Sequence, residues 1–142
     1  MRIPLSLLAV ITLTVPELSA APEVSFSKEV LPILAENCFQ CHGPDENTRE
    51  AELRLDVYED ATRDRDGYQV ISPGNIAKSE LIKRLVSDDE SVKMPPADFG
   101  KHLTKEEVLT LQNWIANGAR FEQHWSFKQI TKPELPRNNK KT

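Results

Sequence analysis

The sequence predicts a mainly helical domain, with room for one small two-stranded ribbon, and three observations lead to this fold class. Apolar residues recur at helical spacing in three separate stretches, near residues 30–34, 81–86 and 108–115. Helix-start signals precede these stretches. The two segments that read as strands, 53–55 and 69–71, are only three residues long. The chain of 142 residues is long enough for one ordinary domain and too short for two.

The first predicted helix begins near residue 27. Ser27 is a suitable N-cap, and Phe26 before it can pack against Leu31 as a hydrophobic staple. Pro32 falls early in this helix, where few backbone hydrogen bonds are yet made, so we expect it to bend the helix rather than abolish it. We expect the helix to lead into the first cysteine of the chain.

The middle of the chain is predicted to be less regular. Gly43-Pro44-Asp45 breaks the chain, and the polar residues 45–52 are expected to form an exposed loop. The segments 53–55 and 69–71 are the candidate strands of the ribbon. Between them, residues 58–63 can form a single helical turn.

Two further helices are predicted in the second half. Ser79 opens a helix whose apolar face lies within residues 81–86. Thr104 and Glu107 form a capping box for the last helix, and Gly118 ends it. The last helix presents one apolar face, made of Val108, Leu111, Trp114 and Ile115. We expect Trp114 to pack this helix against the first one.

The first residues read as a targeting segment. An arginine at position 2 precedes the apolar stretch Ile3–Val15, and small residues follow. The apolar stretch is shorter than the roughly 20 residues of a membrane span, which favours cleavage after Ala20 or Ala21 over an uncleaved anchor. We therefore predict that residues 1–21 are a signal peptide and that the mature protein is exported to the periplasm or cell envelope.

Charge divides the rest of the chain in two. The segment 22–125 holds 12 basic and 20 acidic residues, a balance of −8, whereas the segment 126–142 holds 5 basic residues and 1 acidic residue, a balance of +4. The net charge of −4 argues against a general nucleic-acid binder, which needs a basic face. We predict a folded domain over 22–125 and a basic, proline-containing tail or linker over 126–142.

The segment Cys38-Phe39-Gln40-Cys41-His42 has the C-x-x-C-H pattern of covalent haem attachment. Two thiols at this spacing can add to the two vinyl groups of one haem, and the adjacent histidine can then bind the iron. Shuffling this composition gives the pattern in on the order of three in ten thousand sequences. A redox disulfide needs no histidine after the second cysteine, and zinc needs four ligands, so both remain as weaker alternatives.

The sixth iron ligand is predicted to be Met94, the only methionine after the initiator. Two prolines follow it and stiffen its loop, and a thioether ligand favours ferrous iron. The alternative is a methionine that serves only in packing. His102 and His124 are rival ligands. Four basic residues are candidates for the haem propionates but read more simply as surface residues: Arg54, Lys78, Lys83 and Lys93.

Several short pieces of the chain carry a family resemblance. They are Phe26–Leu34, Cys38–Asp45, Leu53–Asp56, Ser72–Asn75, Lys78–Arg84, Met94–Pro96, Leu103-Thr104, Trp114-Ile115, Gly118-Ala119 and His124–Phe127. In this order they resemble the planctomycete-type cytochrome c domain, from about Phe26 to Phe127. The resemblance implies a class I cytochrome c-like fold, with the N- and C-terminal helices packed around one covalently bound haem c. It matches Cys38 and Cys41 to the attachment thiols and His42 and Met94 to the axial iron ligands.

We therefore expect an exported monohaem c-type cytochrome that transfers single electrons and is not an enzyme. The expected partner is a redox protein with a basic docking patch, and we expect neither nucleic-acid binding nor membrane integration after cleavage. Two alternatives stay open. In the family this domain is usually the N-terminal module of a longer exported protein, so this chain could be a truncated form of one. If Met94 is not an iron ligand, a ligand-binding or peroxidatic haem protein is the other reading.

Overall fold

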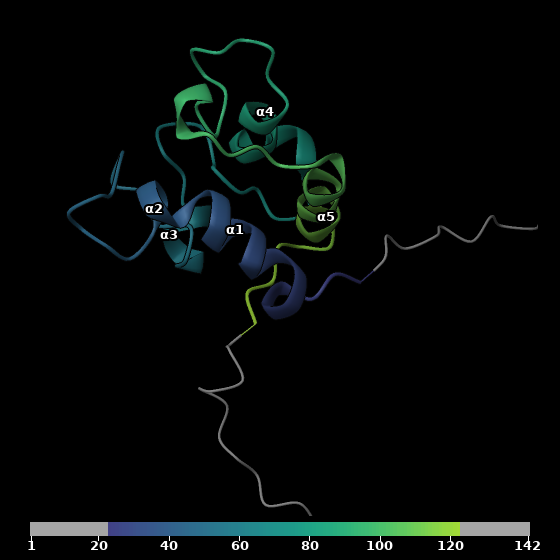
Figure 1. Ribbon diagram of the computed structural model, residues 1–142. Helices are drawn as coiled ribbons and strands as arrows, with labels where there is room; N and C mark the ends of the chain where they lie inside the picture. Colours follow the sequence, from purple (N-terminus) through teal and green to yellow (C-terminus); the bar gives the residue numbers. More distant parts are fainter. Residues whose placement is uncertain (1–22, 123–142) are drawn as a thin grey trace, which may run out of the picture.

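A computed structural model describes residues 23–122 and shows a mainly helical fold. The predicted signal peptide, 1–21, and the predicted tail, 126–142, lie outside these residues. Figure 1 shows α1 in the middle of the domain, with α5 on one side of it and α2 and α3 on the opposite side. The elements in chain order are η1 (Phe26–Val30), α1 (Leu31–Asn37), α2 (Phe39–His42), α3 (Tyr58–Thr62), η2 (Ile76–Lys78), α4 (Glu80–Leu85), η3 (Ala97–Phe99) and α5 (Lys105–Ala116).

The first helix starts earlier than predicted, so Ser27 is not its N-cap. The π-helical turn η1 begins at Phe26, and Ser25 precedes it. The backbone N–H of Ser25 donates to the Glu29 carboxylate at 2.9 Å, which satisfies one amide at the helix start. Phe26 is thereby placed on the helix and buried against Trp114. Pro32, in the first turn of α1, does not abolish the helix, which agrees with that part of the prediction.

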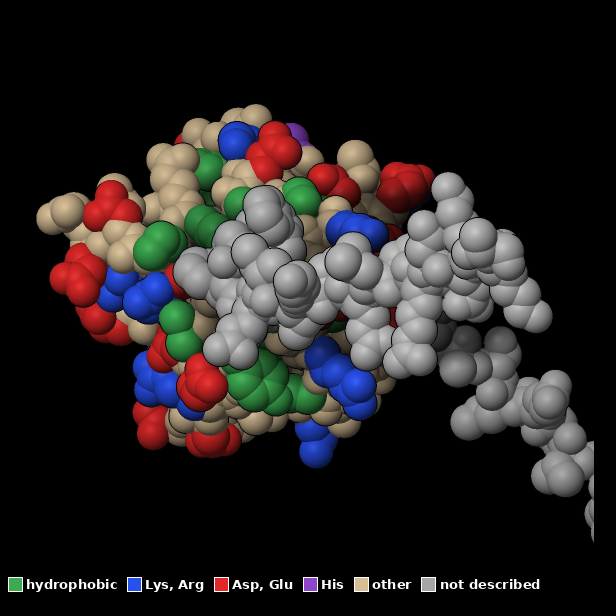
Figure 2. All heavy atoms as spheres, turned by 90° about the horizontal axis from the view of Figure 1, so that it is seen from below, with side chains coloured by type: hydrophobic (Ala, Val, Ile, Leu, Met, Phe, Trp, Pro, Cys, Tyr) green, Lys and Arg blue, Asp and Glu red, His purple; other side chains and the backbone are tan. Residues whose placement is uncertain are grey.

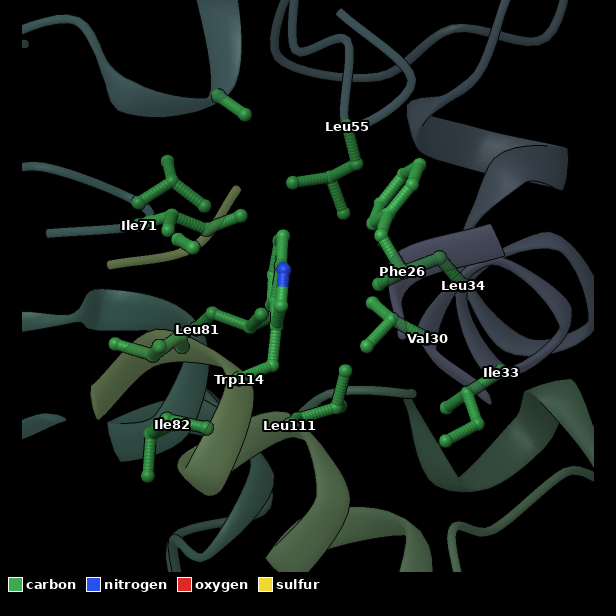
Figure 3. Close-up of a cluster of buried hydrophobic side chains, with 14 of the residues drawn as sticks. Phe26, Val30, Ile33, Leu34, Leu55, Ile71, Leu81, Ile82, Leu111 and Trp114 are labelled. Atoms are coloured by element: carbon green, nitrogen blue, oxygen red, sulfur yellow. The ribbon is translucent and has the colours of Figure 1, made fainter. Parts of the chain in front are cut away.

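Trp114 is the centre of the core. Its ring lies 5.6 Å from that of Phe26 and 5.3 Å from that of Phe121, measured between centroids. In Figure 3 the indole stands between two groups of side chains, with Phe26, Val30 and Leu34 on one side and Ile71 and Leu81 on the other. Its N–H donates to the Arg120 carbonyl at 3.0 Å, so the one polar atom of the indole is satisfied. The prediction that Trp114 packs the last helix against the first is confirmed.

The ends of α5 are also as predicted. The Thr104 hydroxyl accepts from the Glu107 N–H at 3.2 Å, and the Glu107 carboxylate accepts from the Thr104 N–H at 2.7 Å, which completes the capping box. Beyond the helix, Gly118 has a φ of +95°, and its N–H donates to the Ile115 carbonyl. Glycine adopts this backbone conformation without a steric penalty, and the chain can therefore turn back over Trp114.

The predicted ribbon does not form, because its two segments pair with other parts of the chain. The Leu55 N–H donates to the His42 carbonyl at 2.9 Å, and the Ile71 N–H donates to the Ala61 carbonyl at 2.9 Å. The Val70 carbonyl accepts from the N–H of Leu81 at the start of α4. Within residues 23–122 the structure contains only isolated bridges, such as Asp64 with Gln69, and no strand.

The predicted helical turn at 58–63 is present as α3, and the helix predicted after Ser79 is present as α4. Ser79 is fully buried. Its hydroxyl accepts from the Ser72 N–H and donates to the Asn75 carbonyl, both at 2.9 Å. This serine therefore fixes the turn that delivers α4 to the core.

The surface of the domain is mixed in character. On the face drawn in Figure 2, acidic and basic side chains are interspersed, and hydrophobic side chains lie exposed between them. In the described part of the chain, no helix is both long and apolar enough to cross a membrane.

Candidate functional site

The four predicted site residues lie around one cavity of about 600 Å³. Cys38, Cys41 and His42 line it from the end of α1 and from α2, and Met94 lines it from the loop between α4 and η3. Met94 is 52 residues after His42 in the sequence. The fold therefore brings the C-x-x-C-H segment and the only methionine after the initiator to the walls of the same space.

The lining of this cavity fits a haem group. Its volume lies within the range of about 300–1,000 Å³ that is usual for cofactor and ligand pockets. Most of its surface is apolar, as a porphyrin requires, and two thiols, an imidazole and a thioether supply groups that bind haem. The apolar residues that contribute are Leu53, Leu55, Val70, Leu81, Leu85 and Phe99.

Gly43 follows the short helix α2 and lies close to the first residue of that helix, Phe39. A Cβ atom at this position would lie 2.2 Å from the Phe39 carbonyl oxygen and 2.8 Å from the Phe39 Cβ. Only glycine fits where the chain leaves α2. The loop after Gly43 then returns, and the Glu50 N–H donates to the Cys41 carbonyl at 2.7 Å.

The returning loop also orients His42. The Nδ1 atom of His42 lies 3.3 Å from the Glu50 carbonyl oxygen, and an N–H at Nδ1 donates to it. This contact leaves Nε2 with its lone pair free, the arrangement that a metal-binding histidine uses. Burial lowers the pKa of His42, the Glu50 carbonyl opposes this effect, and the positive charges of Arg65 and Arg84 add to the lowering. The site therefore favours the neutral imidazole, which is the form that binds a metal.

Cys38 and Cys41 are free thiols, and the surroundings of Cys38 differ from those of a cysteine in a redox disulfide. Burial raises the pKa of the Cys38 thiol to about 12. Thiol–disulfide exchange enzymes need a cysteine with a lowered pKa, because the thiolate is the attacking species. The environment of Cys38 therefore disfavours the redox-disulfide alternative and suits a thiol in an apolar cavity wall.

Met94 is held by backbone contacts with α4. Its N–H donates to the Arg84 carbonyl at 3.1 Å, and the Arg84 guanidinium donates to the Val92 carbonyl at 3.4 Å. Pro95 is buried, and the Met94–Pro95 peptide bond is cis. The loop that carries the thioether is thus attached to the last turn of α4, whose Leu81 and Leu85 line the cavity.

Of the two rival histidines, His102 lies within the described residues and does not line this cavity. His102 is exposed and lines a second pocket of about 280 Å³, on which Met94, Pro95 and Leu85 also border. His124 lies outside the described residues. Within residues 23–122 no group of three or more Cys, His, Asp or Glu side chains is placed to hold a metal ion.

Sequence reasoning missed three features that shape the site: Arg84 in the cavity wall, the close packing of Gly43 and the Glu50 carbonyl. None of the four basic propionate candidates lines the cavity, but Arg84 does. Arg84 could have been found, since it lies on the same helical face as Leu81 and Leu85. The role of Gly43 depends on its close contact with Phe39, which only the folded chain shows. The Glu50 carbonyl gives no signal in the sequence, because every residue has a backbone carbonyl.

Comparison with known proteins gives a family match over the central part of the domain. The family model of Planctomycete cytochrome C matches residues 38–98, a stretch that contains the C-x-x-C-H segment, Met94 and most of the cavity wall. Searches of curated proteins and of solved structures return no match. The mainly helical structure is consistent with a small cytochrome c-like fold, and a cytochrome c domain carries covalently bound haem. The match supports the resemblance of this domain to the planctomycete-type cytochrome c domain.

Proposed function

We propose that this protein is an exported monohaem cytochrome c that carries single electrons. One observation carries the proposal: the C-x-x-C-H segment and Met94, which are 52 residues apart, line the same apolar cavity. A cavity with one attachment motif accommodates one haem. When bound, haem supplies an iron that cycles between the ferric and ferrous states.

The residues of the cavity divide the tasks of binding. Cys38 and Cys41 supply the two thiols for thioether bonds to the vinyl groups. His42 supplies Nε2 as one axial ligand, since its Nδ1 atom is engaged by the Glu50 carbonyl. Met94 supplies a thioether as the second axial ligand, which favours ferrous iron and raises the reduction potential.

This ligand set favours electron transfer over catalysis. If His42 and Met94 occupy both axial positions, no position is left for a substrate, a gas or a peroxide. With haem bound, the apolar lining would limit the contact of the iron with water and so disfavour the ferric form, which carries more charge. The main requirement that remains is a haem edge close enough to the surface for a partner to reach.

The redox partner is proposed to carry a basic patch. The segment 22–125 has an excess of acidic over basic residues, with 20 against 12. Three of the acidic side chains, Glu50, Glu80 and Asp98, line the haem cavity itself. Attraction between unlike charges speeds the encounter of two proteins and is screened by salt, so we expect the rate of electron exchange with a basic partner to fall as salt rises.

The first experiment examines protein expressed in a host that attaches c-type haem. Haem staining after denaturing electrophoresis tests covalent attachment, and visible spectra of both oxidation states test the axial ligands. We expect a stained band, a low-spin ferrous spectrum and the far-red ferric band of iron–sulfur ligation. A protein without covalent haem would overturn the proposal, and a stained protein with high-spin ferric iron would instead support a ligand-binding or peroxidatic function.

His42→Ala in the same host separates attachment from ligation. The two thiols are unchanged, so we expect a stained band to persist while the low-spin spectrum is lost. A low-spin spectrum that survives this substitution would remove His42 from the proposed ligand set.

A further inference from the structure

The turn 50–53 in the wall of the haem cavity has an unusual backbone. Its central residues, Ala51 and Glu52, have φ of 55° and 49°, and the Leu53 N–H closes the turn by donating to the Glu50 carbonyl at 3.2 Å. A positive φ at both central positions is the pattern of a type I′ turn, which favours asparagine, aspartate and glycine. A side chain with a Cβ atom is disfavoured in this conformation, so the turn needs support from its surroundings.

The turn 65–68 has the same pattern of positive φ and a sequence that suits it. Its central residues, Asp66 and Gly67, have φ of 56° and 97°, and the Arg65 N–H donates to the Tyr68 carbonyl at 2.8 Å. Asp-Gly is one of the preferred pairs for such a turn. Residues of both turns line the cavity, namely Glu50, Ala51, Leu53 and Tyr68. Of these two turns, only the turn 50–53 is built against its local preference.

The turn 50–53 is fixed by contacts with α2 and with Arg65. The Glu50 N–H donates to the Cys41 carbonyl at 2.7 Å, and the Arg65 guanidinium donates to the Glu52 carbonyl at 3.3 Å. The Glu50 carbonyl accepts both the N–H that closes the turn and the Nδ1 atom of His42, at 3.3 Å. A carbonyl oxygen has two lone pairs and can accept both bonds. The carbonyl that orients His42 is therefore directed by the turn that carries it.

We propose that Ala51 and Glu52 are positioning residues for His42. Their left-handed backbone directs the Glu50 carbonyl at Nδ1 of the imidazole. This inference rests on the proposed function. Strained backbone persists only where the surrounding contacts enforce it, and it is common at functional sites. A hydrogen bond from Nδ1 raises the basicity of a metal-bound imidazole and fixes the orientation of its ring. The turn thereby favours ferric iron and lowers the reduction potential, in opposition to the Met94 thioether.

Two substitutions of Glu52 separate the effect of the backbone from that of the charge. Glu52→Gly and Glu52→Val both remove the same exposed carboxylate. Glycine adopts a positive φ readily, whereas a β-branched residue is strongly disfavoured there. The readouts, on ferrous protein with covalently attached haem, are the exchange rate of the His42 Nδ1 proton with deuterium, measured by NMR, and the reduction potential.

We expect the Nδ1 proton to exchange faster in Glu52→Val than in Glu52→Gly, on the order of tenfold, because the turn opens more often. The reduction potential should be higher in Glu52→Val than in Glu52→Gly, because a weaker hydrogen bond makes His42 a weaker donor to ferric iron. Glu52→Gly should exchange no faster than the wild type and should melt at a higher temperature. Glu52→Thr, which is β-branched but polar, serves if Glu52→Val fails to fold.

The turn 65–68 supplies the matched control. Asp66 has a φ of 56° and is exposed, as Glu52 is. Asp66→Gly and Asp66→Val therefore make the same pair of changes in a turn that does not carry the carbonyl bound to His42. We expect Asp66→Val to lower the melting temperature about as much as Glu52→Val does, and to change the exchange rate of the Nδ1 proton far less.

Two results in a protein with covalent, low-spin haem would overturn the inference and leave the proposed function in place. The first is an equal exchange rate, or an equal potential, in Glu52→Val and Glu52→Gly. The second is an equal effect in the Asp66 pair, which would show a general loss of stability. A wild-type protein without covalent haem would overturn the proposed function itself, and with it the inference, because His42 would have no iron to bind.

Discussion

The domain has two halves that are built differently. The half made of η1, α1 and α5 is closed by aromatic packing, in which the rings of Phe26 and Phe121 stack with centroids 4.4 Å apart. The half around the cavity consists largely of irregular backbone, and between residues 86 and 103 the described chain contains only the short turn η3. The first half gains stability from buried apolar surface, whereas the second is held by particular hydrogen bonds.

The two halves should respond differently to substitutions. Single backbone contacts fix the ligand-bearing segments of the cavity half, such as the Leu55 N–H to the His42 carbonyl and the Met94 N–H to the Arg84 carbonyl. A packed core tolerates the loss of such a contact better than a loop does. We therefore expect substitutions in the packed half to change the stability of the whole domain, and those in the cavity half to change the site first.

The largest expected effect is that of Trp114→Ala in the packed half. Removing a fully buried indole leaves a cavity at the centre of the core and should cost about 3–5 kcal/mol of unfolding free energy. Leu109→Ala on the same helix is the control, since Leu109 is 54% exposed and should cost less than about 0.5 kcal/mol. Denaturant unfolding of the two variants checks this, and similar costs would contradict the division into halves.

Met94→Ala should act on the site and spare the fold. We expect haem to stay attached, the reduction potential to fall, and the iron to bind added imidazole or cyanide, because the second axial position opens. His102→Ala should change neither the potential nor the spectrum. An unchanged potential in the Met94 variant, or loss of the low-spin spectrum in the His102 variant, would show that the sixth ligand was assigned wrongly.

The sequence predicted the packed half better than the cavity half. The apolar spacing of α5 and its capping box are local signals, and the structure has both. The contact between Trp114 and Phe26 also followed from two amphipathic helices that must bury their apolar faces against each other.

The cavity half was predicted only where a motif marked it. The spacing of Cys38, Cys41 and His42 predicted a haem site, but the segments 53–55 and 69–71 were misread as strands. Leu53 and Leu55 are buried on either side of Arg54, as alternation predicts, whereas the adjacent Val70 and Ile71 are both buried. The backbone groups of the two segments bind α2, α3 and α4 instead of each other. Apolar residues at every second position indicate that alternate side chains are buried, but they do not show which segment the backbone groups will bind.

Gly43→Ala tests the end of α2, the helix that carries Cys41 and His42. The added Cβ would meet the Phe39 backbone at 2.2 Å, and α2 can relieve this only by moving, so we expect a loss of about 3 kcal/mol and a changed haem spectrum. Gly67→Ala is the control: Gly67 has a φ of +97° but nothing within 4 Å of an added Cβ, so only backbone strain of about 1 kcal/mol is expected. Equal losses in the two variants would mean that Gly43 serves only as a flexible residue.

The smallest expected effect concerns the charges of the cavity half and depends on pH. Burial raises the pKa of Asp60, but the Arg54 N–H and the guanidinium groups of Arg63 and Arg65 outweigh it and hold the pKa below its ordinary value. A carboxylate whose pKa is lowered by folding stabilises the folded state above the pKa of the unfolded chain, about 3.9, and this contribution is lost as the pH falls through the folded value. The melting temperature of Asp60→Asn should therefore lie below that of the wild type at pH 7.

As the pH falls through the lowered pKa of Asp60, the two melting temperatures should converge. Glu59→Gln removes a neighbouring negative charge from an exposed side chain of the same helix and should show a smaller difference at pH 7. A deficit in Asp60→Asn that persists unchanged at low pH would mean that Asp60 acts through shape rather than charge. The cavity half would then resemble the packed half after all, because both would depend on the fit of neutral groups.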